Sequence, residues 1–245
     1  MSSEKLMQIF YITGTSRGLG KSIAETLLRE PTNTVYGLSR STSIEHERYH
    51  HINLNLSRYD EVKSFDFLPH QNARSITLIN NAGILGKLQH IGRQSYDATA
   101  EVMQVNVVSL SCLMDRFVAA YRHSNIPRTV INLSSGASKF PIDGWAAYCA
   151  SKAAVDMLSE VADKELRLEG VDGFRILSLA PGVVDTDMQG EIRDSDGEEF
   201  YDKQTFVDYK NNKELQSPEG AAAKIISIYD RLESIEGVCL SARDY

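Results

Sequence analysis

Tyr148 and Lys152 lie four residues apart in a stretch with a helical pattern, so their side chains share one helix face. A phenol has a pKa of about 10, and a nearby ammonium favours its phenolate, which makes the phenol usable as an acid or base near neutral pH. Ser135 follows a strand-like run, where its hydroxyl can hydrogen-bond a carbonyl oxygen as charge develops there. A tyrosine–lysine pair alone is common on solvated faces; its order after Ser135 and a glycine-rich turn indicates acid–base chemistry.

Three glycines, Gly14, Gly18 and Gly20, follow the first strand-like run, and a helical pattern begins directly after them. Glycines at a strand-to-helix turn let the backbone approach a pyrophosphate, which then lies at the positive end of the helix. The spacing is G-x-x-x-G-x-G and not the G-x-G-x-x-G fingerprint, so the turn alone is as often an ordinary turn as a dinucleotide site. Its place in the first β–α unit favours the dinucleotide site.

The end of the second strand-like run, Ser39-Arg40, bears on the choice of dinucleotide. A site for NAD usually has a carboxylate near this point for the ribose hydroxyls, whereas an arginine accommodates the 2′-phosphate of NADP. No Asp or Glu lies between Pro31 and Ile44, and Arg17 in the glycine turn is a second cation within reach. Either arginine alone is equally well an ordinary surface charge, but the two together predict NADP.

Short β-rich runs alternate with longer helical patterns along the chain, which is typical of a parallel sheet covered by helices. Most runs are apolar without strict alternation, as expected for strands buried on both faces. Strands are expected at 7–13, 34–39, 50–54, 75–80, 129–134, 174–180 and 237–241, and helices at roughly 18–30, 94–123, 145–169 and 218–235. We therefore expect an α/β fold with a doubly wound parallel sheet of about seven strands, helices on both faces, and one domain over residues 1–245.

Residues 187–215 interrupt this alternation with a polar and mostly acidic stretch that follows the end of a strand. Such a stretch is either a solvated surface excursion or a lid over a binding cleft. We expect it to act as the lid of the substrate site.

Composition excludes several other classes of protein. The chain has 245 residues, 42% of them hydrophobic, and a net charge of −7, which argues against a nucleic-acid-binding face. Its three scattered cysteines predict neither disulfides nor zinc, and the crowded His46, His50 and His51 lack the carboxylates or cysteines of a metal site. We expect no signal segment, no run of membrane-spanning length and a cytoplasmic protein.

Taken in chain order, these motifs resemble the short-chain dehydrogenase/reductase family, and the resemblance covers essentially the whole chain. It rests on the turn from Thr13 to Gly20, Asn80-Asn81-Ala82-Gly83, Ser135, Tyr148-x-x-x-Lys152 and Pro181-Gly182. It implies a Rossmann-like fold that binds NADP(H), with Tyr148 as the acid that protonates a small-molecule carbonyl substrate. It also implies that Asn106 holds a water in a proton relay, that Lys152 binds the nicotinamide ribose, and that helices 94–123 and 145–169 form a homodimer interface.

The predicted site combines the motifs with the resemblance. The catalytic residues are Asn106, Ser135, Tyr148 and Lys152. The residues expected to contact NADP(H) are Gly14, Ser16, Arg17, Gly18, Leu19, Gly20, Ser39, Arg40, Asn55, Asn81, Ala82, Gly83, Tyr148, Lys152, Pro181, Val184 and Thr186. The substrate is expected to contact Ser135, Trp145 and Met188, and no metal is predicted.

The segments around Tyr148 and Pro181 further resemble the benzil reductase and sepiapterin reductase branch of this family, with benzil reductase the closer. Two positions depart from it. Asn55 stands where the family has an adenine-contacting aspartate, so we expect a changed contact with the base. Asp244 does not align with the aspartate that anchors the pterin in sepiapterin reductase, which leaves acceptance of a pterin open.

Trp145 and Met188 are expected to form an apolar slot for a phenyl ring, although a lone tryptophan at a helix start can equally anchor the core. The predicted activity is NADPH-dependent reduction of a ketone or an α-diketone. A catalytically idle protein that senses NADP(H) is the alternative, but it would not need the phenol–ammonium pair. A sugar-nucleotide epimerase is disfavoured because little chain follows Pro181.

Overall fold

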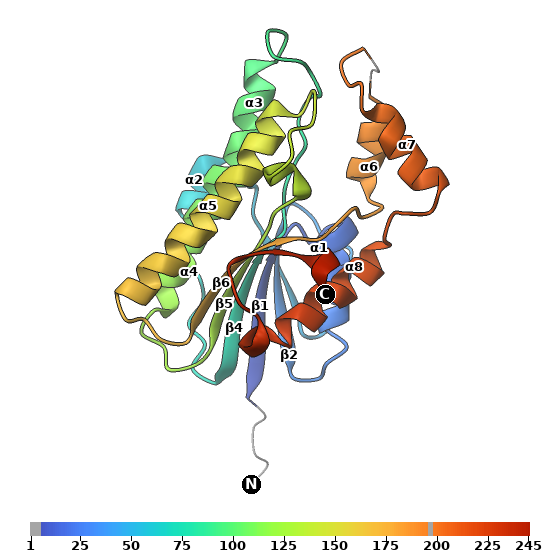
Figure 1. Ribbon diagram of the computed structural model, residues 1–245. Coiled ribbons are helices and arrows are strands. Elements are labelled where there is room, and N and C mark those ends of the chain that lie inside the picture. Colours follow the sequence, from blue (N-terminus) through green and yellow to red (C-terminus); the bar gives the residue numbers. More distant parts are fainter. Residues whose placement is uncertain (1–5, 196–197) are drawn as a thin grey trace.

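The computed structural model describes residues 6–195 and 198–245, which fold around a seven-stranded parallel sheet (Figure 1). The strand order is β3-β2-β1-β4-β5-β6-β7, so the sheet grows outward in both directions from the β1–β4 pair. The strands are β1 Met7–Thr13, β2 Asn33–Ser39, β3 Tyr49–Asn53, β4 Ala73–Asn80, β5 Arg128–Leu133, β6 Phe174–Ala180 and β7 Cys239–Ser241. This is the doubly wound α/β fold that the alternating pattern predicted, with a topological switch point between β1 and β4.

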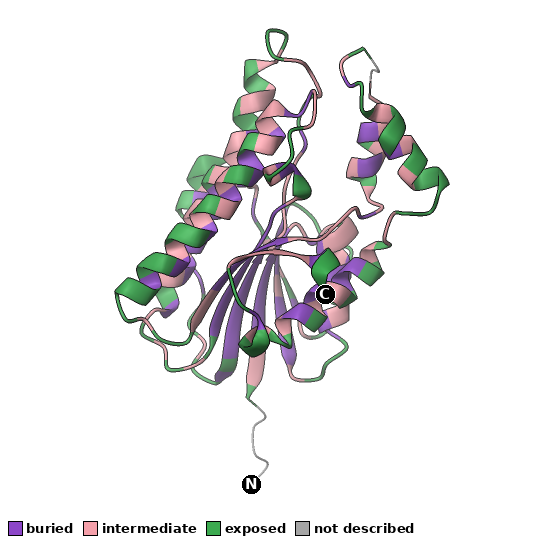
Figure 2. Ribbon diagram, in the orientation of Figure 1, coloured by how far each residue is buried: buried purple, intermediate pink, exposed green. Residues whose placement is uncertain are grey.

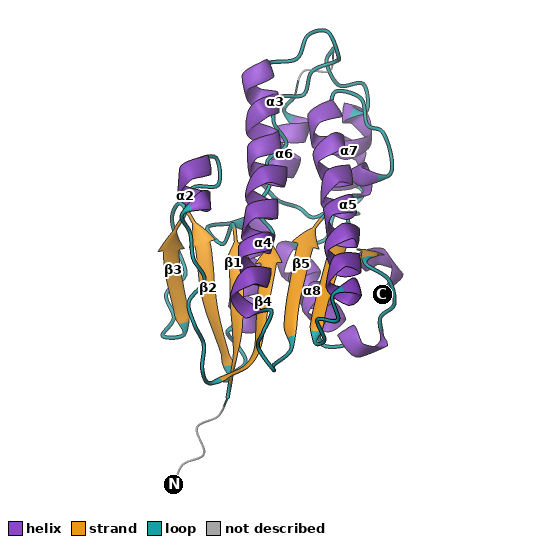
Figure 3. Cartoon of the chain, turned by 90° about the vertical axis from the view of Figure 1, so that its left-hand side faces the viewer, coloured by secondary structure: helices purple, strands orange, loops and turns teal. Residues whose placement is uncertain are grey.

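Eight α-helices connect and cover the described strands. They are α1 Gly18–Leu27, α2 Tyr59–Lys63, α3 Tyr96–Met103, α4 Ser109–Tyr121, α5 Ala146–Leu168, α6 Asp187–Arg193, α7 Lys203–Asn211 and α8 Pro218–Tyr229. Helices α4 and α5 lie along one face of the sheet, and α1 and α8 lie on the other (Figures 1 and 3). Helices α6 and α7 stand beyond the carboxyl ends of the strands.

Successive side chains of each strand point to opposite faces of the sheet, and each face has its own hydrophobic core. In β1, Phe10 and Ile12 point to the face covered by α1 and α8, whereas Ile9 and Tyr11 point to the face covered by α2, α4 and α5. Strands buried on both faces have no solvated side, which explains why the strand-like runs were apolar without alternation (Figure 2).

The segment 187–215 leaves and re-enters the fold at one point. Val184 and Gln216 form an isolated parallel bridge, in which Asp185 N donates to Gln216 O at 2.8 Å and Gln216 N donates to Val183 O at 3.0 Å. Between these ends lie α6 and α7, so the polar stretch is partly helical.

Several boundaries differ from the sequence-based expectation. The helix expected at 94–123 is interrupted by a π-helical turn, Gln104–Val108, and the helix expected at 218–235 ends at Tyr229. The short helix α2 and the helices α6 and α7 were not predicted, because their polar composition gives little helical periodicity.

One helical stretch of the described residues, Tyr96–Tyr121, is 26 residues long and contains an 18-residue window with a mean hydropathy of 1.3, so it is long and apolar enough to cross a membrane by length and composition alone. The expectation that no segment approaches such a span is therefore wrong. The apolar character has a physical reason in this fold, because Leu113, Phe117 and Tyr121 pack into the core beside the sheet.

Candidate active site

The glycine-rich turn forms a close-packed cradle between β1 and α1. Gly14 and Gly18 have φ angles of +75° and +57°, which side chains rarely adopt. A Cβ atom at Gly20 would lie 2.3 Å from both Asn81 Nδ2 and Gly14 O, so only glycine fits there. Arg17 at the start of α1 provides no side-chain cap, and the first turn contains no acidic residue. The N–H groups of this helix end are therefore suited to an anionic ligand, such as a phosphate.

Two threonines that sequence reasoning missed hold this cradle in place. The Thr13 hydroxyl accepts from Asn81 N and Ala82 N, both at 3.0 Å, while Asn81 Nδ2 donates to Thr13 O at 2.9 Å. Thr15 Oγ1 lies 2.8 Å from the Tyr49 hydroxyl. Buried hydroxyls require hydrogen-bond partners, but the sequence does not reveal which groups these two threonines bind.

The predicted 2′-phosphate residues lie in different surroundings. Arg40 is exposed directly after β2. Ser39 is buried, and its hydroxyl donates to Ser41 O at 2.7 Å. Arg17 is also exposed and forms an ion pair with Asp187 at 3.1 Å, which joins the glycine turn to the first residue of α6. Of the three side chains, Arg40 is therefore the one that extends freely toward solvent at the end of β2.

Asn55 lies after β3 and builds a local turn. Its Oδ1 accepts from Ser57 N at 3.1 Å and from Ser57 Oγ at 2.8 Å, and its backbone N–H donates to Glu61 Oε2 at 3.0 Å. Asn53, Leu54 and Glu61 line an open groove beside it. The Asn55 side chain thus offers its Nδ2 donor to a base, whereas an aspartate would offer only acceptors.

Ser135, Tyr148 and Lys152 come together beyond the carboxyl end of β5, as predicted. Tyr148 and Lys152 are buried on one face of α5, and Lys152 Nζ donates to Leu133 O at 2.8 Å. A hydrogen bond links the Tyr148 side chain with Ser135.

Burial dominates the ionisation of the tyrosine–lysine pair. It raises the pKa of Tyr148 to about 12, against the smaller lowering effect of the Ser135 hydrogen bond. It lowers the pKa of Lys152 to about 8, and the nearby Asp156 carboxylate opposes that change. The pKa of Tyr148 is therefore raised and not lowered as expected, because desolvation by burial is its largest influence and the Ser135 hydrogen bond, not Lys152, is the group that opposes it. The phenol stays protonated at neutral pH, which is the state required of a general acid.

Asn106 lies in the π-helical turn that separates α3 from α4. Its Oδ1 accepts from Ile84 N and its Nδ2 donates to Ile84 O, both at 2.9 Å, and Nδ2 also donates to Ser151 at 3.0 Å. A Cβ atom at Gly83 would lie 3.4 Å from Asn106 Oδ1 and 3.5 Å from Lys152 Nζ. Asn106, Gly83 and Lys152 therefore adjoin one another, and π-helical turns of this kind are frequent at functional sites.

The loop after β6 closes the other side of the site. Pro181 is half-buried, Val184 is buried and Thr186 precedes α6. A Cβ atom at Gly18 would lie 3.5 Å from the Thr186 methyl group, so this loop lies against the glycine turn. The predicted cofactor residues from β1, β4 and β6 thus lie around one edge of the sheet.

Trp145 joins an aromatic cluster above Tyr148, and it is itself buried. Its ring meets that of Tyr148 edge-on at a centroid distance of 5.4 Å and stacks on Phe200 at 5.7 Å. Met188 of α6 packs against the same cluster. The two predicted substrate residues thus lie near each other and near Tyr148, and Phe200 and Phe206 are cluster members that the sequence did not single out.

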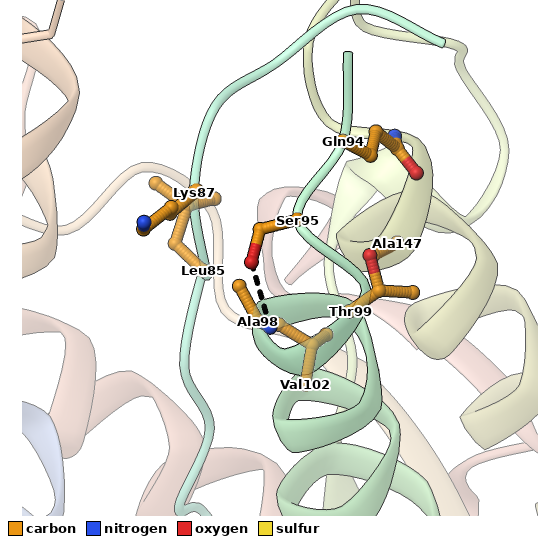
Figure 4. Close-up of a pocket in the computed structure, with 8 residues that line it drawn as sticks. All are labelled: Leu85, Lys87, Gln94, Ser95, Ala98, Thr99, Val102 and Ala147. Atoms are coloured by element: carbon orange, nitrogen blue, oxygen red, sulfur yellow. Dashed lines mark hydrogen bonds between the residues drawn. The ribbon is translucent and has the colours of Figure 1, made fainter. Parts of the chain in front are cut away.

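Figure 4 shows a cavity near this cluster, bordered by Leu85, Ser95 at the start of α3, and Ala147 of α5. Its volume is about 10 Å³, which is room for about one water molecule. Only 7% of the Tyr148 surface is exposed. None of the residues that border this cavity is among the predicted catalytic or substrate-contacting residues, so the cavity lies beside the predicted site and not in it.

The three histidines near β3 have separate surroundings. His46 accepts from Arg48 N, His51 lies 2.9 Å from Ser39 O, and the His50 ring adjoins Tyr36. Within residues 6–195 and 198–245 there is no group of three or more His, Cys, Asp or Glu that could hold a metal ion.

Comparison with known proteins defines the class of this protein. The chain belongs to the short chain dehydrogenase family, whose model matches residues 8–197. It is 34% identical over 247 residues to the benzil reductase ((S)-benzoin forming) of Bacillus cereus, covering 94% of this chain and 97% of the relative. It is 29% identical to the sepiapterin reductase of Bos taurus, covering 91% and 90%. These matches confirm the predicted resemblance to that branch.

The fold is confirmed by a solved structure as well. The crystal structure of the KRED1-Pglu enzyme matches with a TM-score of 0.78 and 28% identity, covering 95% of this chain and 100% of that chain. The protein is therefore an oxidoreductase with the Rossmann-like fold of its family.

Proposed function

We propose that the protein reduces the carbonyl group of a ketone or an α-diketone with NADPH, and that an aromatic diketone such as benzil is a substrate. The observation that carries the proposal is the meeting of Ser135, protonated Tyr148 and Lys152 beside the glycine cradle. The similarity to a benzil reductase over nearly the whole chain supports the choice of substrate.

The residues present fit a dinucleotide. The Gly20 position leaves no space for a side chain, and the uncapped start of α1 presents N–H groups suited to a pyrophosphate. Lys152, which adjoins Gly83, would hold the nicotinamide ribose, and Val184 and Thr186 would hold the carboxamide. Arg40, with Arg17 as a second cation, favours the 2′-phosphate of NADPH over NADH.

Side chains of the protein donate the proton to the substrate and replace it afterwards. Bound NADPH supplies the hydride that the carbonyl carbon receives. Tyr148 donates its proton to the carbonyl oxygen, which gives the alcohol, while the Ser135 hydroxyl orients that oxygen. The Lys152 ammonium stabilises the phenolate that remains, and Asn106 supports the water through which the proton is replaced.

Trp145 and Met188 flank the substrate ring in this proposal, and segment 187–215 closes above it. The cluster around Trp145 is apolar and aromatic, which suits a phenyl group more than a sugar or a charged acid.

The protein is further proposed to be a cytoplasmic homodimer. Met157 and Val161 are exposed on α5, and Val108 is exposed beside α4, so the helical face away from the sheet carries apolar surface that a second copy would cover. The three cysteines are free, which suits a reducing compartment.

Turnover of benzil by the purified protein, with NADPH and NADH compared at equal concentration, tests the activity and the cofactor choice together. We expect reduction to benzoin with a clear preference for NADPH. Tight NADPH binding without reduction of benzil or other aromatic ketones would support the sensor alternative instead.

A further inference from the structure

Asp143 connects the loop before α5 to the residues that precede α7. Its Oδ2 accepts from Tyr201 N at 2.7 Å, and its Oδ1 accepts from Asp202 N at 3.3 Å. These N–H groups belong to the segment leading into α7, which starts at Lys203, and Asp202 provides no side-chain cap there. The carboxylate therefore satisfies two backbone donors just before a helix, and these donors lie 58 and 59 residues further along the chain.

A second carboxylate reinforces this junction. Glu199 pairs with Arg93 at 2.8 Å and accepts from His90 N at 3.2 Å. A Cβ atom at Gly144 would lie 2.7 Å from Glu199 O, so the backbone of residues 143–144 is fitted closely against residue 199. Three segments, 90–93, 143–144 and 199–202, thus meet at one place.

His90 also belongs to this junction, and its two partners determine which ring nitrogen carries the proton. Its Nδ1 faces Arg93 at 3.1 Å, and because a guanidinium only donates, Nδ1 is the acceptor. In the neutral ring the proton then lies on Nε2, which donates to Asp143 Oδ2 at 3.3 Å. Burial acts to raise the pKa of Asp143, but the bonds from Tyr201 N and His90 outweigh it and hold the pKa below the usual value. Asp143 is thus a carboxylate at neutral pH.

The segment that Asp143 binds also contains Phe200, whose ring packs near Tyr148. Phe200 is fully buried, and its ring stacks on Trp145 at 5.7 Å with an interplanar angle of 29°. Trp145 in turn meets Tyr148 edge-on at 5.4 Å. Asp143 is also two residues before Trp145 in the chain, so the same carboxylate borders both partners of the stack.

We propose that Asp143 is a positioning residue, which holds residues 200–202 so that Phe200 fixes the indole of Trp145 as the wall of the substrate site beside Tyr148. An ordinary exposed ion pair would contribute little, but here the acceptor binds backbone donors and its side chain is 29% exposed. The kinetic part of this inference rests on the proposed reductase function, whereas its structural part does not.

The test compares Asp143→Ala with Asp143→Asn, which keeps one acceptor oxygen, and with the control Asp66→Ala, which removes an ion-paired aspartate far from the site. For Asp143→Ala we expect KM for benzil to rise about tenfold while kcat stays within about twofold and KM for NADPH is unchanged. The KM for benzil of Asp143→Asn should lie between those of Asp143→Ala and wild type, and the KM of Asp66→Ala should equal that of wild type.

Trp145 provides a readout that needs no turnover, because it is the single tryptophan of the chain. Its emission should shift to the red in Asp143→Ala, should shift less in Asp143→Asn and should stay unchanged in Asp66→Ala. Unchanged emission together with unchanged KM for benzil would overturn the proposal, as would equal losses of benzil and NADPH binding. If wild type fails to reduce benzil, the proposed function fails, and the emission of the variants alone decides the role of Asp143.

Discussion

Lys152 Nζ lies 5.6 Å from the centroid of the Tyr148 ring and donates to the carbonyl oxygen of Leu133. The ammonium is therefore held against the strand end and beside the phenol, in a place where both groups are buried. Burial favours the neutral form of each, which separates a protonated tyrosine from a lysine that titrates near pH 8. Burial of Lys152 beside Tyr148 therefore lowers the stability of the folded protein while the lysine is charged.

Lys152→Met should lower turnover at least about a hundredfold and yet stabilise the folded protein at pH 7. The folded pKa of about 8 lies below the usual 10.5, so the charged lysine opposes folding below pH 8. The variant avoids this cost, but the Leu133 carbonyl loses its hydrogen bond, which offsets part of the gain. The net increase in the free energy of unfolding at pH 7 is about 2 kcal/mol. Between pH 8 and pH 10.5 the unfolded chain still binds the proton of Lys152, whereas the folded chain has lost it. The stability of wild type therefore rises with pH, and the stability difference between wild type and Lys152→Met becomes smaller.

Thermal unfolding at pH 7 and at about pH 10 measures this difference. Lys63→Met is the matched control, since Lys63 is an exposed lysine on α2 and its replacement should give no pH-dependent gap. A Lys152→Met protein that melts below wild type at pH 7 would contradict the prediction.

Tyr148→Phe should reduce turnover of benzil by at least about a hundredfold, because it deletes the acidic hydroxyl and little else. Fluorescence titration should show NADPH binding within about twofold of wild type. Retention of more than about a hundredth of wild-type turnover would mean that another group protonates the substrate.

Arg40→Ala should weaken NADPH far more than NADH, since a charge-assisted hydrogen bond to the 2′-phosphate is lost. The ratio of the two dissociation constants is the quantity to measure. Arg17→Ala is the comparison, and it should change this ratio less because Arg17 also pairs with Asp187. If Arg40→Ala affects both cofactors equally, the preference is determined elsewhere.

Met188→Ala should raise KM for benzil more than KM for the small aliphatic diketone diacetyl, because burial of a ring against the methionine supplies the difference. Steady-state kinetics with both substrates in parallel measures it. Equal effects on the two would show that Met188 does not touch the ring.

The sheet could be predicted from the sequence because most of its strands are apolar runs bounded by turns, and the strand ends fall within about two residues of expectation. Tyr148, Lys152 and Ser135 could be placed together because their spacing and chain order define the site. Thr13 and Tyr49 could not, since a hydroxyl under the cradle differs from any other strand hydroxyl only in its partner.

The surroundings of Tyr148 were harder to predict. Phe200 contacts Trp145 across 55 residues of chain, through a segment whose polar composition gives no periodic signal. The π-helical turn at Asn106 also has no pattern of its own, because one added residue in a helical turn leaves the apolar spacing nearly intact. Long-range packing, and not local propensity, determines both.

The bridge between Val184 and Gln216 places the two ends of the intervening stretch beside each other. Insertions, deletions or replacements between Asp185 and Gln216 would leave β6 and α8 in register, since the closing hydrogen bonds belong to Val183, Asp185 and Gln216 at the two ends of the stretch. The segment is therefore an exchangeable cassette. Relatives could diverge in the molecules they accept, and engineered chimeras could be built, by swapping this piece while the nucleotide-binding half of the molecule is retained.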